Sequence, residues 1–305
     1  MDGDLVLQAE DVDADSRLDV FVSDNIVEFT RSFLKKHIES GNITVNGKAQ
    51  KAGYKLKAGD IIFVSRIENM IPDILQENIA LDIIYEDMDI IVINKPKGMV
   101  VHPAAGHYSG TLVNALMYHC KNELSGINGY LRPGIVHRID MDTSGVIVAA
   151  KNDKAHKSLA EQFAVHSINR VYEAICVNIV KEDNIDIDKP IGRHPVDRKK
   201  MCITDKNSRN AVTHIKVIER FHANTFVEAR LETGRTHQIR VHMAHMGHPL
   251  VGDMVYGSSK DKYKTEGQAL FAKSLGFIHP STGDYIEFDA ERPEYLENLL
   301  KKLRG

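Results

Sequence analysis

The sequence contains few cysteines and no long apolar segment. Its three cysteines, Cys120, Cys176 and Cys202, are far apart and have neither a CxxC spacing nor the spacing of a zinc site. Because an odd number also argues against a set of disulfides, a reducing compartment is expected. No apolar run approaches the roughly 18 residues of a membrane helix, and the start of the chain lacks the positive charge of a signal peptide. We therefore expect a cytoplasmic protein.

Motifs of several large enzyme classes are also missing. The chain has no GxxxxGK[ST] phosphate loop, no GxGxxG fingerprint and no GxSxG elbow. HRID at residues 137–140 matches part of a kinase catalytic loop, but the glycine-rich loop, the paired lysine and the Asp-Phe-Gly motif are absent. His242 and His245 share one face of an expected helix without a carboxylate partner, so we expect no metal site.

The rest of the composition is that of an ordinary globular protein, with 43% hydrophobic and 27% charged residues. A length of 305 residues suggests two domains, or one large and one small. Residues 1–15 hold six acidic residues and no basic one, and we expect them to form a flexible acidic tail. Residues 16–70, in contrast, hold nine Lys and Arg against six Asp and Glu. An excess of three does not by itself distinguish a nucleic-acid surface from a solvated one.

Residues 16–70 have the pattern of a small αβ module. Apolar spacing predicts two helices, the second running from near Thr30 to Gly41, and strands are expected at 43–45 and 61–64. Four basic residues lie on or near the helices, namely Arg17, Arg31, Lys35 and Lys36. They form either a solvated face or a surface for an anionic partner.

A second domain is expected over residues 81–305, after a linker at residues 71–80 that contains Pro72. Strand patterns are frequent in this domain and helical patterns are few. The expected helices cover residues 110–119, 154–165, 236–245 and 295–303. This order predicts an α+β fold with a mostly antiparallel sheet.

The most unusual stretch covers residues 133–151. Its second part, Gly145–Ala150, is apolar and β-branched, which predicts a short buried strand. Its first part, His137–Ser144, places an imidazole, a guanidinium, two carboxylates and two hydroxyls within eight residues. A rigid strand that holds such a polar loop is a common way to present a reactive side chain.

Asp140 is the first catalytic candidate in this loop, since it lies between apolar Ile139 and Met141 just before the strand. It could equally cap a turn through its own backbone. Asp142 is the competing carboxylate, but the sequence Asp-Thr-Ser-Gly that it begins is typical of a turn.

Arg240 and Arg235 are candidates for a partner cation. Arg240 lies between apolar Ile239 and Val241 on a predicted helix, so it borders the core and needs an anionic partner. An aspartate held against such an arginine is expected to stay ionised. The alternative is a purely structural salt bridge.

Four ordered motifs resemble those of the RluA/RluD family of RNA pseudouridine synthases. HRIDMDTSG at residues 137–145 is similar to the family's HRLDxxTSG signature, and NKPKG at 94–98 resembles its NKPxG turn. NRVYEA at 169–174 resembles its tyrosine strand, and TGRTHQIRVH at 233–242 resembles its TGRTHQ[IL]R motif. The module at 16–70 resembles an S4 RNA-binding domain.

The resemblance implies a catalytic role for three residues. Asp140 matches the family's essential aspartate, Tyr172 its base-packing tyrosine, and Arg240 the basic residue that pairs with the aspartate. The implied fold is α+β around a bent, mostly antiparallel mixed sheet, with no cofactor and no metal. Whether Asp140 attacks the ribose, attacks the uracil or takes a ribose proton stays open.

The resemblance also implies an RNA partner, expected to be ribosomal RNA of the large subunit, and we expect a monomer. Arg138 resembles the arginine that enters the RNA helix in place of the flipped nucleotide. The other expected RNA contacts, which hold mainly the phosphate backbone, are His137, Arg17, Arg31, Lys35, Lys36, Arg198, Lys199, Lys200 and Arg235.

Two departures from the family pattern lie near the end of the chain. Phe271 stands where the family usually has histidine, and Glu291-Arg292-Pro293 replaces the usual Ala-Pro-Leu-Pro. Two other functions stay possible at this point: an RNA-binding assembly factor with a vestigial site, and an RNA glycosidase or nuclease that uses Asp140 and Asp142.

Overall fold

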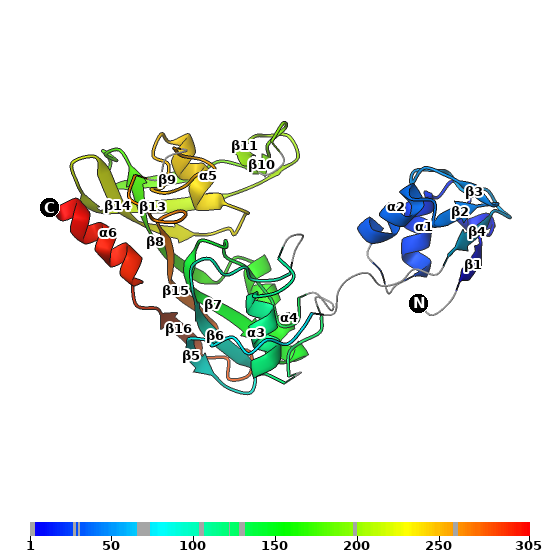
Figure 1. The fold of residues 1–305 in the computed structure, drawn as a ribbon, viewed down its shortest axis with the longest axis horizontal. Coiled ribbons are helices and arrows are strands. Elements are labelled where there is room, and N and C mark those ends of the chain that lie inside the picture. The colour runs from blue at the N-terminus through cyan, green and yellow to red at the C-terminus, as the bar shows by residue number, and fades with distance from the viewer. Residues whose placement is uncertain are drawn as a thin grey trace. The chain divides into compact units, whose positions relative to one another are not determined.

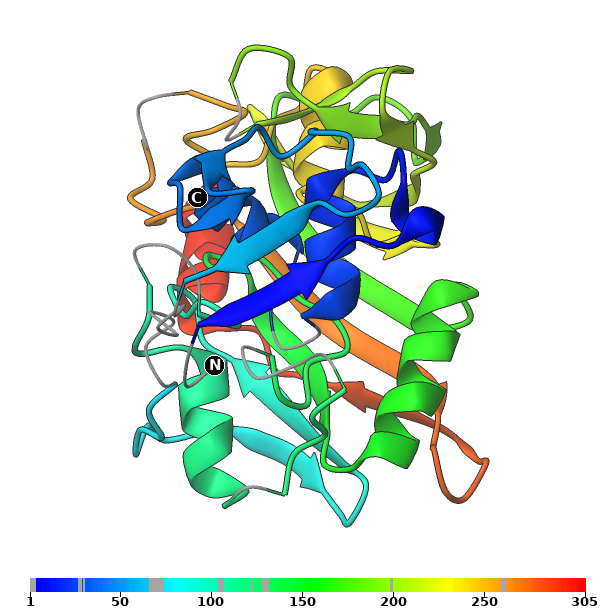
Figure 2. The ribbon, with the colours of Figure 1, turned by 90° about the vertical axis from the view of Figure 1, so that its right-hand side faces the viewer.

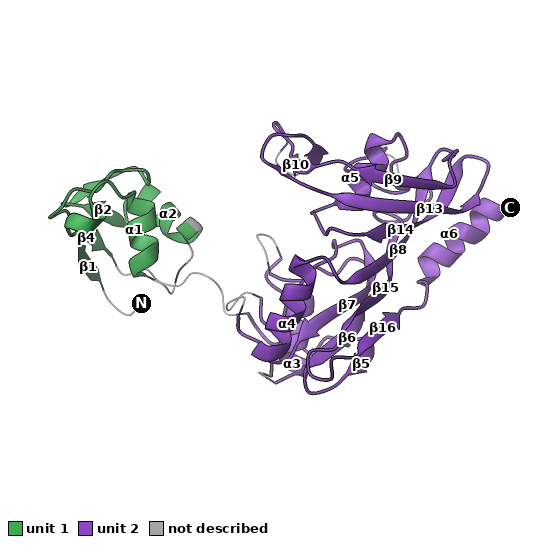
Figure 3. Cartoon of the chain, turned by 180° about the vertical axis from the view of Figure 1, so that it is seen from behind, with its two compact units in different colours: residues 1–73 green, residues 74–305 purple. Residues whose placement is uncertain are grey.

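The structure is a computed structural model that describes residues 4–26, 29, 31–65, 74–103, 107–121, 123–127, 132–197, 200–258 and 262–305. The chain divides into two compact units, residues 1–73 and residues 74–305 (Figure 3). No helix among the described residues is long and apolar enough to cross a membrane.

The first unit packs two helices, α1 (Leu18–Asn25) and α2 (Arg31–Glu39), against a four-stranded sheet (Figure 1). The strand order is β1-β4-β2-β3, and every neighbouring pair is antiparallel. The strands are β1 (Leu5–Gln8), β2 (Ile43–Val45), β3 (Lys48–Ala49) and β4 (Ile61–Val64). Leu18, Val22 and Leu34 from the helices are fully buried in the core of this unit.

The prediction of a flexible tail over residues 1–15 is wrong for Leu5–Gln8. This segment pairs with β4 along its whole length, with Leu5 opposite Val64 and Gln8 opposite Ile61. Leu5 and Leu7 pack on the core while Val6 is 60% exposed. Burial of the two leucines and pairing with β4 therefore hold this short strand in place despite the surrounding acidic charge.

The second unit is built on one nine-stranded sheet, with the order β5-β6-β7-β15-β8-β14-β13-β9 and β16 paired to β15. Its strands are β5 (Ile83–Glu86), β6 (Ile90–Lys95), β7 (Ser144–Ala150), β8 (Asn169–Val177), β9 (Asn184–Asp188), β13 (Val212–Arg220), β14 (Asn224–Leu231), β15 (Leu270–Ile278) and β16 (Tyr285–Asp289). The pair β7–β15 is parallel and the other pairs are antiparallel. The predicted α+β class with a mostly antiparallel, mixed sheet is confirmed.

Four helices and a small sheet complete this unit. The helices are α3 (Leu112–His119), α4 (Asp153–Ala164), α5 (Gln238–His245) and α6 (Glu294–Arg304). A three-stranded sheet has the order β11-β10-β12, with β10 (Ile191–Arg193), β11 (Met201–Ile203) and β12 (Ser208–Arg209). Helix α5 contacts β11, and the two elements lie together in Figures 1 and 2.

Every residue of β7 is buried, because the strand is covered on both faces. Ile147 and Ala149 pack with α3, whereas Val146 and Val148 pack with α4 on the opposite face. A strand covered in this way needs a continuous apolar sequence rather than an alternating one. The sheet thus fixes the polar loop that precedes β7.

The predicted linker over residues 71–80 is wrong for residues 74–80, which belong to the second unit. Ile74 is buried in its core, and the Asn114 side chain donates a hydrogen bond to the Leu75 carbonyl at 2.8 Å. The Glu77 N–H in turn donates to the Asn114 carbonyl at 3.0 Å. Residues 71–73 lie outside the described residues.

Candidate active site

A pocket of about 240 Å³ opens between the loop before β7, the start of β8 and the start of α5. The side chains that line it include Arg138, Asp140, Arg170, Tyr172, His237 and Arg240. Residues from three predicted motifs, roughly 30 to 100 positions apart, therefore meet in one place. The three predicted catalytic residues are all among them.

Arg240 connects Asp140 to a second carboxylate, Asp253. Its Nη1 donates to Oδ2 of Asp140 at 2.9 Å, while Nε and Nη2 donate to the two carboxylate oxygens of Asp253 at 2.7 and 3.0 Å. The Arg240 side chain is 6% exposed and that of Asp140 is 19% exposed. The predicted pairing of Asp140 with Arg240 agrees with this geometry, and Oδ1 of Asp140 is not held by Arg240.

Asp253 is a site residue that had no predicted role. Its side chain is fully buried and also accepts hydrogen bonds from the N–H groups of Val255 and Tyr256. Burial acts to raise the pKa of Asp253, but the hydrogen bonds and charge of Arg240 outweigh it and hold that pKa below its ordinary value. The bidentate contact fixes the guanidinium plane, so Asp253 orients Arg240 toward Asp140.

A chain of two hydrogen bonds places His237 near Asp140. The Met201 N–H on β11 donates to the Tyr256 hydroxyl at 2.8 Å, and this hydroxyl lies 2.8 Å from Nδ1 of His237. Nε2 of His237 then lies 3.9 Å from Oδ1 of Asp140. Burial lowers the pKa of His237, and a neutral imidazole that accepts from Tyr256 carries its proton on Nε2, toward the aspartate.

Tyr172 lies on β8 and borders the same pocket. Burial raises the pKa of its hydroxyl, which therefore stays protonated at neutral pH. Two residues earlier on the same strand, Arg170 also reaches the pocket, as residues two apart on a strand share one face.

The expectation that His137 binds RNA does not fit its contacts. Nε2 of His137 accepts the backbone N–H of Val148 at 3.1 Å, and the ring stacks on Phe163 with centroids 4.5 Å apart. Burial lowers the pKa of His137 to about 3, so the ring is neutral. His137 ties the polar loop to β7 and presents no cation to a phosphate.

The remaining predicted RNA contacts of the second unit are placed differently. Arg138 is exposed at the pocket rim, and Arg235 donates from Nε to the Asn210 carbonyl at 2.9 Å. Lys200 lies just before β11, and its carbonyl accepts the His194 N–H. Arg198 and Lys199 lie outside the described residues.

Lys95, in the predicted turn, is fully buried and holds the loop that precedes β7. Its Nζ donates to the carbonyls of Pro96, Met99 and Met141 at 2.8, 2.9 and 3.0 Å. Burial lowers the pKa of Lys95 to about 7. Since Met141 directly follows Asp140, this lysine fixes the backbone next to the Asp140 carboxylate.

Gly145 closes the loop where β7 meets β15. Its φ is +114°, and a Cβ there would lie 2.0 Å from the Ala272 carbonyl oxygen. The glycine of the signature is therefore required by the approach of two backbones.

Comparison with known proteins matches the family "RNA pseudouridylate synthase" over residues 89–245 and an S4 domain over residues 16–62. The chain is 49% identical to the "Uncharacterized RNA pseudouridine synthase YlyB" of Bacillus subtilis strain 168, over 98% of this chain and 97% of that protein. The chain belongs to the RNA pseudouridylate synthase family. It is thus an enzyme that converts uridine in RNA to pseudouridine.

Two further similarities agree with this synthase assignment. The synthase is 46% identical to the "Ribosomal large subunit pseudouridine synthase D" of Zymomonas mobilis, over 94% of this chain and 93% of that protein. Its fold resembles the solved structure of "Human RNA Pseudouridylate Synthase Domain Containing 1" with a TM-score of 0.57 and 25% identity, covering 74% of this chain and 95% of that one.

The two departures from the family pattern leave the pocket intact. Phe271 is fully buried in a core cluster beneath α6. Arg292 pairs with Glu173, whose side chain is 1% exposed, through an Nη2–Oε1 contact of 3.0 Å. Because Glu173 follows Tyr172 on β8, its side chain lies on the opposite strand face, where Arg292 and Lys273 neutralise it.

In the S4 unit of the synthase, Arg17 and Arg31 both hold Asp19. Arg17 donates to Oδ1 of Asp19 at 2.9 Å and Arg31 donates to Oδ2 at 2.8 Å. The Asp19 side chain is 4% exposed, whereas about half of each arginine is exposed. The hydrogen bond from Arg17 is the largest of the effects that lower the pKa of Asp19 to about 2. One buried carboxylate thus fixes two cations side by side at the surface.

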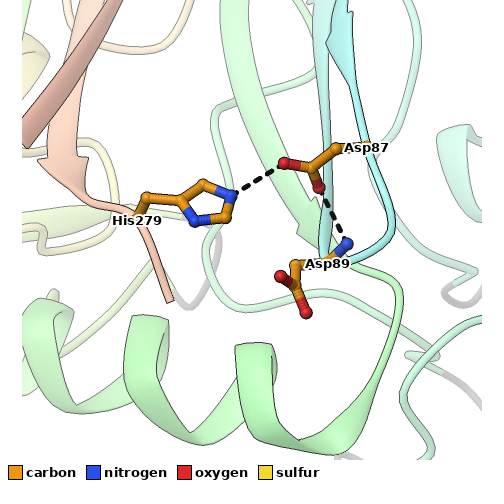
Figure 4. Close-up of side chains that lie close together, drawn as sticks. All are labelled: Asp87, Asp89 and His279. Carbon is orange, nitrogen blue, oxygen red and sulfur yellow. Dashed lines mark hydrogen bonds and ion pairs between the residues drawn. The ribbon is translucent and has the colours of Figure 1, made fainter. Parts of the chain in front are cut away.

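A group of possible metal ligands in the synthase lies away from the pocket, at Asp87, Asp89 and His279 (Figure 4). Nε2 of His279 contacts Oδ2 of Asp87 at 2.8 Å, and its Nδ1 accepts from the backbone N–H groups of residues 281 and 282. Oδ1 of Asp87 accepts the N–H groups of Asp89 and Ile90. With both imidazole nitrogens and both Asp87 oxygens engaged, the group joins the β5–β6 turn to the end of β15.

Proposed function

We propose that this synthase isomerises uridines of large-subunit ribosomal RNA, with Asp140 as the catalytic aspartate. The observation that carries the residue assignment is the contact of Asp140 with Arg240 at 2.9 Å in a pocket that also holds Tyr172. The choice of RNA is supported by the names of several relatives, including the ribosomal large subunit synthase D of Zymomonas mobilis.

The reaction breaks the C1′–N1 bond of uridine, turns the uracil and joins it to the ribose through C5. Asp140 serves this sequence through the carboxylate oxygen that Arg240 does not hold. Tyr172 packs on the uracil, and its hydroxyl stays protonated because burial raises its pKa. Arg240 and Asp253 keep the aspartate in place, which leaves little reorganisation for the chemical step.

The target nucleotide must leave its stack to enter a pocket of this size, at a cost on the order of a few kcal/mol. Arg138 is exposed at the rim, where a guanidinium can enter the space that the nucleotide leaves. Arg235 and Lys200 on the second unit would contact phosphates. On the S4 unit, the same task falls to Arg17, Arg31, Lys35 and Lys36.

Mapping pseudouridines across ribosomal RNA tests this proposal. RNA from a strain without the gene is compared with RNA from the same strain that carries the wild-type gene or the Asp140→Asn gene. We expect one or more large-subunit positions to lose pseudouridine, to regain it with the wild type and to stay unmodified with the variant. A full set of modifications in the deletion strain would contradict the choice of ribosomal RNA, and restoration by Asp140→Asn would contradict the role of Asp140.

A further inference from the structure

Arg170 is a second buried arginine of the pocket, and the proposed mechanism gives it no task. It is 6% exposed. Nη2 donates to the Glu232 carbonyl at 2.6 Å, and Nε has no hydrogen-bond partner. Within the described part of the chain, Arg170 forms no salt bridge with a carboxylate. A buried guanidinium without a paired anion is costly unless a ligand supplies the charge.

The other arginines of the pocket differ from Arg170 in this respect. Arg240 is held by two carboxylates, so the Arg240, Asp140 and Asp253 group has a net charge of −1. Arg138 is exposed and Arg235 is half-buried, which leaves both accessible to water and to phosphates. Among the described residues, Arg170 is therefore the buried cation of the pocket that has no carboxylate partner and is available to a bound ligand.

The position of the Arg170 guanidinium is set by its neighbours. It lies 5.7 Å from the centre of the Phe163 ring, and it shares a strand face with Tyr172. On the other side it packs on Gly234, where a Cβ would lie 2.5 Å from Nη1 of Arg170. The glycine thus leaves the space that the guanidinium occupies beside the base-packing tyrosine.

The reaction creates a charge at this place. The step applies to the two mechanisms in which Asp140 acts at the ribose, by attack on C1′ or by taking a ribose proton: when the C1′–N1 bond breaks, its electron pair stays on the uracil. The detached uracil carries one negative charge, spread over N1 and its carbonyl oxygens, until C5 bonds to C1′, the C5 proton leaves and N1 takes up a proton. A preorganised cation in a buried site stabilises such a developing charge strongly.

We propose that Arg170 stabilises the uracil anion between cleavage of the C1′–N1 bond and formation of the C1′–C5 bond. The proposal rests on the proposed function, because it takes Asp140 and Tyr172 as the groups that flank the uracil. Arg170 is then a catalytic residue in the strict sense, since its guanidinium contacts the reacting base.

A change of leaving group tests this role. Two RNAs that carry either uridine or 5-fluorouridine at a position modified by the wild type are compared in single-turnover reactions with enzyme in excess. Digestion and mass spectrometry follow the loss of the N-linked nucleoside. Fluorine withdraws electrons and stabilises the anion by itself. We therefore expect Arg170→Gln to slow the uridine reaction by roughly 100-fold or more and the 5-fluorouridine reaction by no more than about one tenth of that factor.

Equal slowing of the two substrates would overturn the proposal, as would weaker RNA binding with an unchanged single-turnover rate, which would assign Arg170 to a phosphate. Arg235→Gln is the matched control from the half-buried arginine: as a phosphate contact it should weaken RNA binding and leave the ratio of the two single-turnover rates as in the wild type. Failure of the proposed function is a separate result, because the wild type would then form no pseudouridine in the uridine RNA.

Two variants keep the test decisive if Arg170→Gln does not fold. Arg170→Lys retains the charge but lacks the planar fork, and Gly234→Ala displaces the guanidinium without removing it. Each should again slow uridine more than 5-fluorouridine, by a smaller ratio than Arg170→Gln. The proposal fails if both variants slow the two substrates equally or slow neither.

Discussion

The two units of the synthase use the same ion-pair chemistry with opposite stoichiometry. In the pocket one arginine, Arg240, lies between the carboxylates of Asp140 and Asp253 and the group has a net charge of −1. In the S4 unit one carboxylate, Asp19, lies between Arg17 and Arg31 and the group has a net charge of +1. In the proposed function the residue type present twice does the work in each group: a carboxylate acts in the chemistry, and the two arginines bind the RNA polyanion.

The two ion-pair groups also differ in how far their side chains are buried. The Arg240 side chain is 6% exposed and Asp253 is fully buried, whereas Arg17 and Arg31 are about half exposed. A buried group cannot exchange its partner for water, so loss of one member leaves an uncompensated charge. An exposed arginine can be hydrated when its ion pair is lost, so a substitution there leaves the fold intact. Its main effect is then on the binding of RNA. The variants below test this difference.

The largest effect is expected for Arg240→Gln. It leaves Asp253 buried without its cation, so the free energy of unfolding should fall by about 3–5 kcal/mol, and the rate of pseudouridine formation should fall by at least about 100-fold. Urea denaturation and single-turnover assays measure the two effects. Arg31→Gln removes one of the two half-exposed arginines and leaves Asp19 paired with Arg17, so it should cost much less stability. An equal loss in both variants would contradict the comparison.

Lys95→Met is expected to have the next largest effect. The variant keeps an unbranched side chain but loses three hydrogen bonds to the carbonyls of Pro96, Met99 and Met141. An intramolecular hydrogen bond contributes on the order of 0.5–1.5 kcal/mol, and the backbone beside Asp140 loses its anchor. We expect slower catalysis together with a lower unfolding temperature. Full activity in a destabilised variant would show that Lys95 acts on the fold alone.

A smaller effect should follow from pH, through His137. Its pKa is about 3 in the folded protein against 6.5 ordinarily. Between these two pH values His137 is protonated in the unfolded chain and neutral in the folded chain. The free energy of unfolding therefore falls as pH falls below 6.5. The contribution of this group is about 1.4 kcal/mol per pH unit. Urea denaturation at pH 7.5 and 5.5 should show a smaller pH effect in His137→Gln, while exposed His245→Gln should behave as the wild type.

The smallest effects are expected on the S4 unit. Replacing Arg17 or Arg31 with glutamine should weaken RNA binding and reduce the slope of log K against log salt by about 1 for each phosphate that the variant no longer binds. Filter binding over a range of salt concentrations measures this slope. If Lys48→Gln, outside the helices, changed the slope by the same amount, the paired arginines would have no special role.

Much of this architecture could be predicted, because local patterns decide it. The apolar, β-branched run before Lys151 predicted β7, and helical spacing predicted α2, α4 and α5 to within a few residues. The apolar neighbours of Arg240 predicted that it borders the core and needs an anion. Each of these properties depends on residues close together in the sequence.

Other features depend on contacts between distant segments and could not be predicted in this way. Nothing near Asp253 shows that its carboxylate meets a guanidinium 13 positions earlier. Whether His137 is a cation or a hydrogen-bond acceptor depends on a contact with a distant backbone group. In the structure the Val148 N–H donates to its ring, so the ring is an acceptor. The strand at Leu5–Gln8 exists because β4 offers an open edge. A buried arginine such as Arg170 is recognisable only once its surroundings are known.

The central claim is that Asp140 performs the chemistry while Arg240 and Asp253 hold it. The most direct measurement is single-turnover pseudouridine formation by Asp140→Asn, with Asp142→Asn as the matched control and RNA affinity and thermal unfolding recorded for both. Asp140→Asn should form no detectable pseudouridine while it folds and binds RNA, and Asp142→Asn should keep measurable conversion. Pseudouridine formation by Asp140→Asn at a rate near that of the wild type would contradict the account.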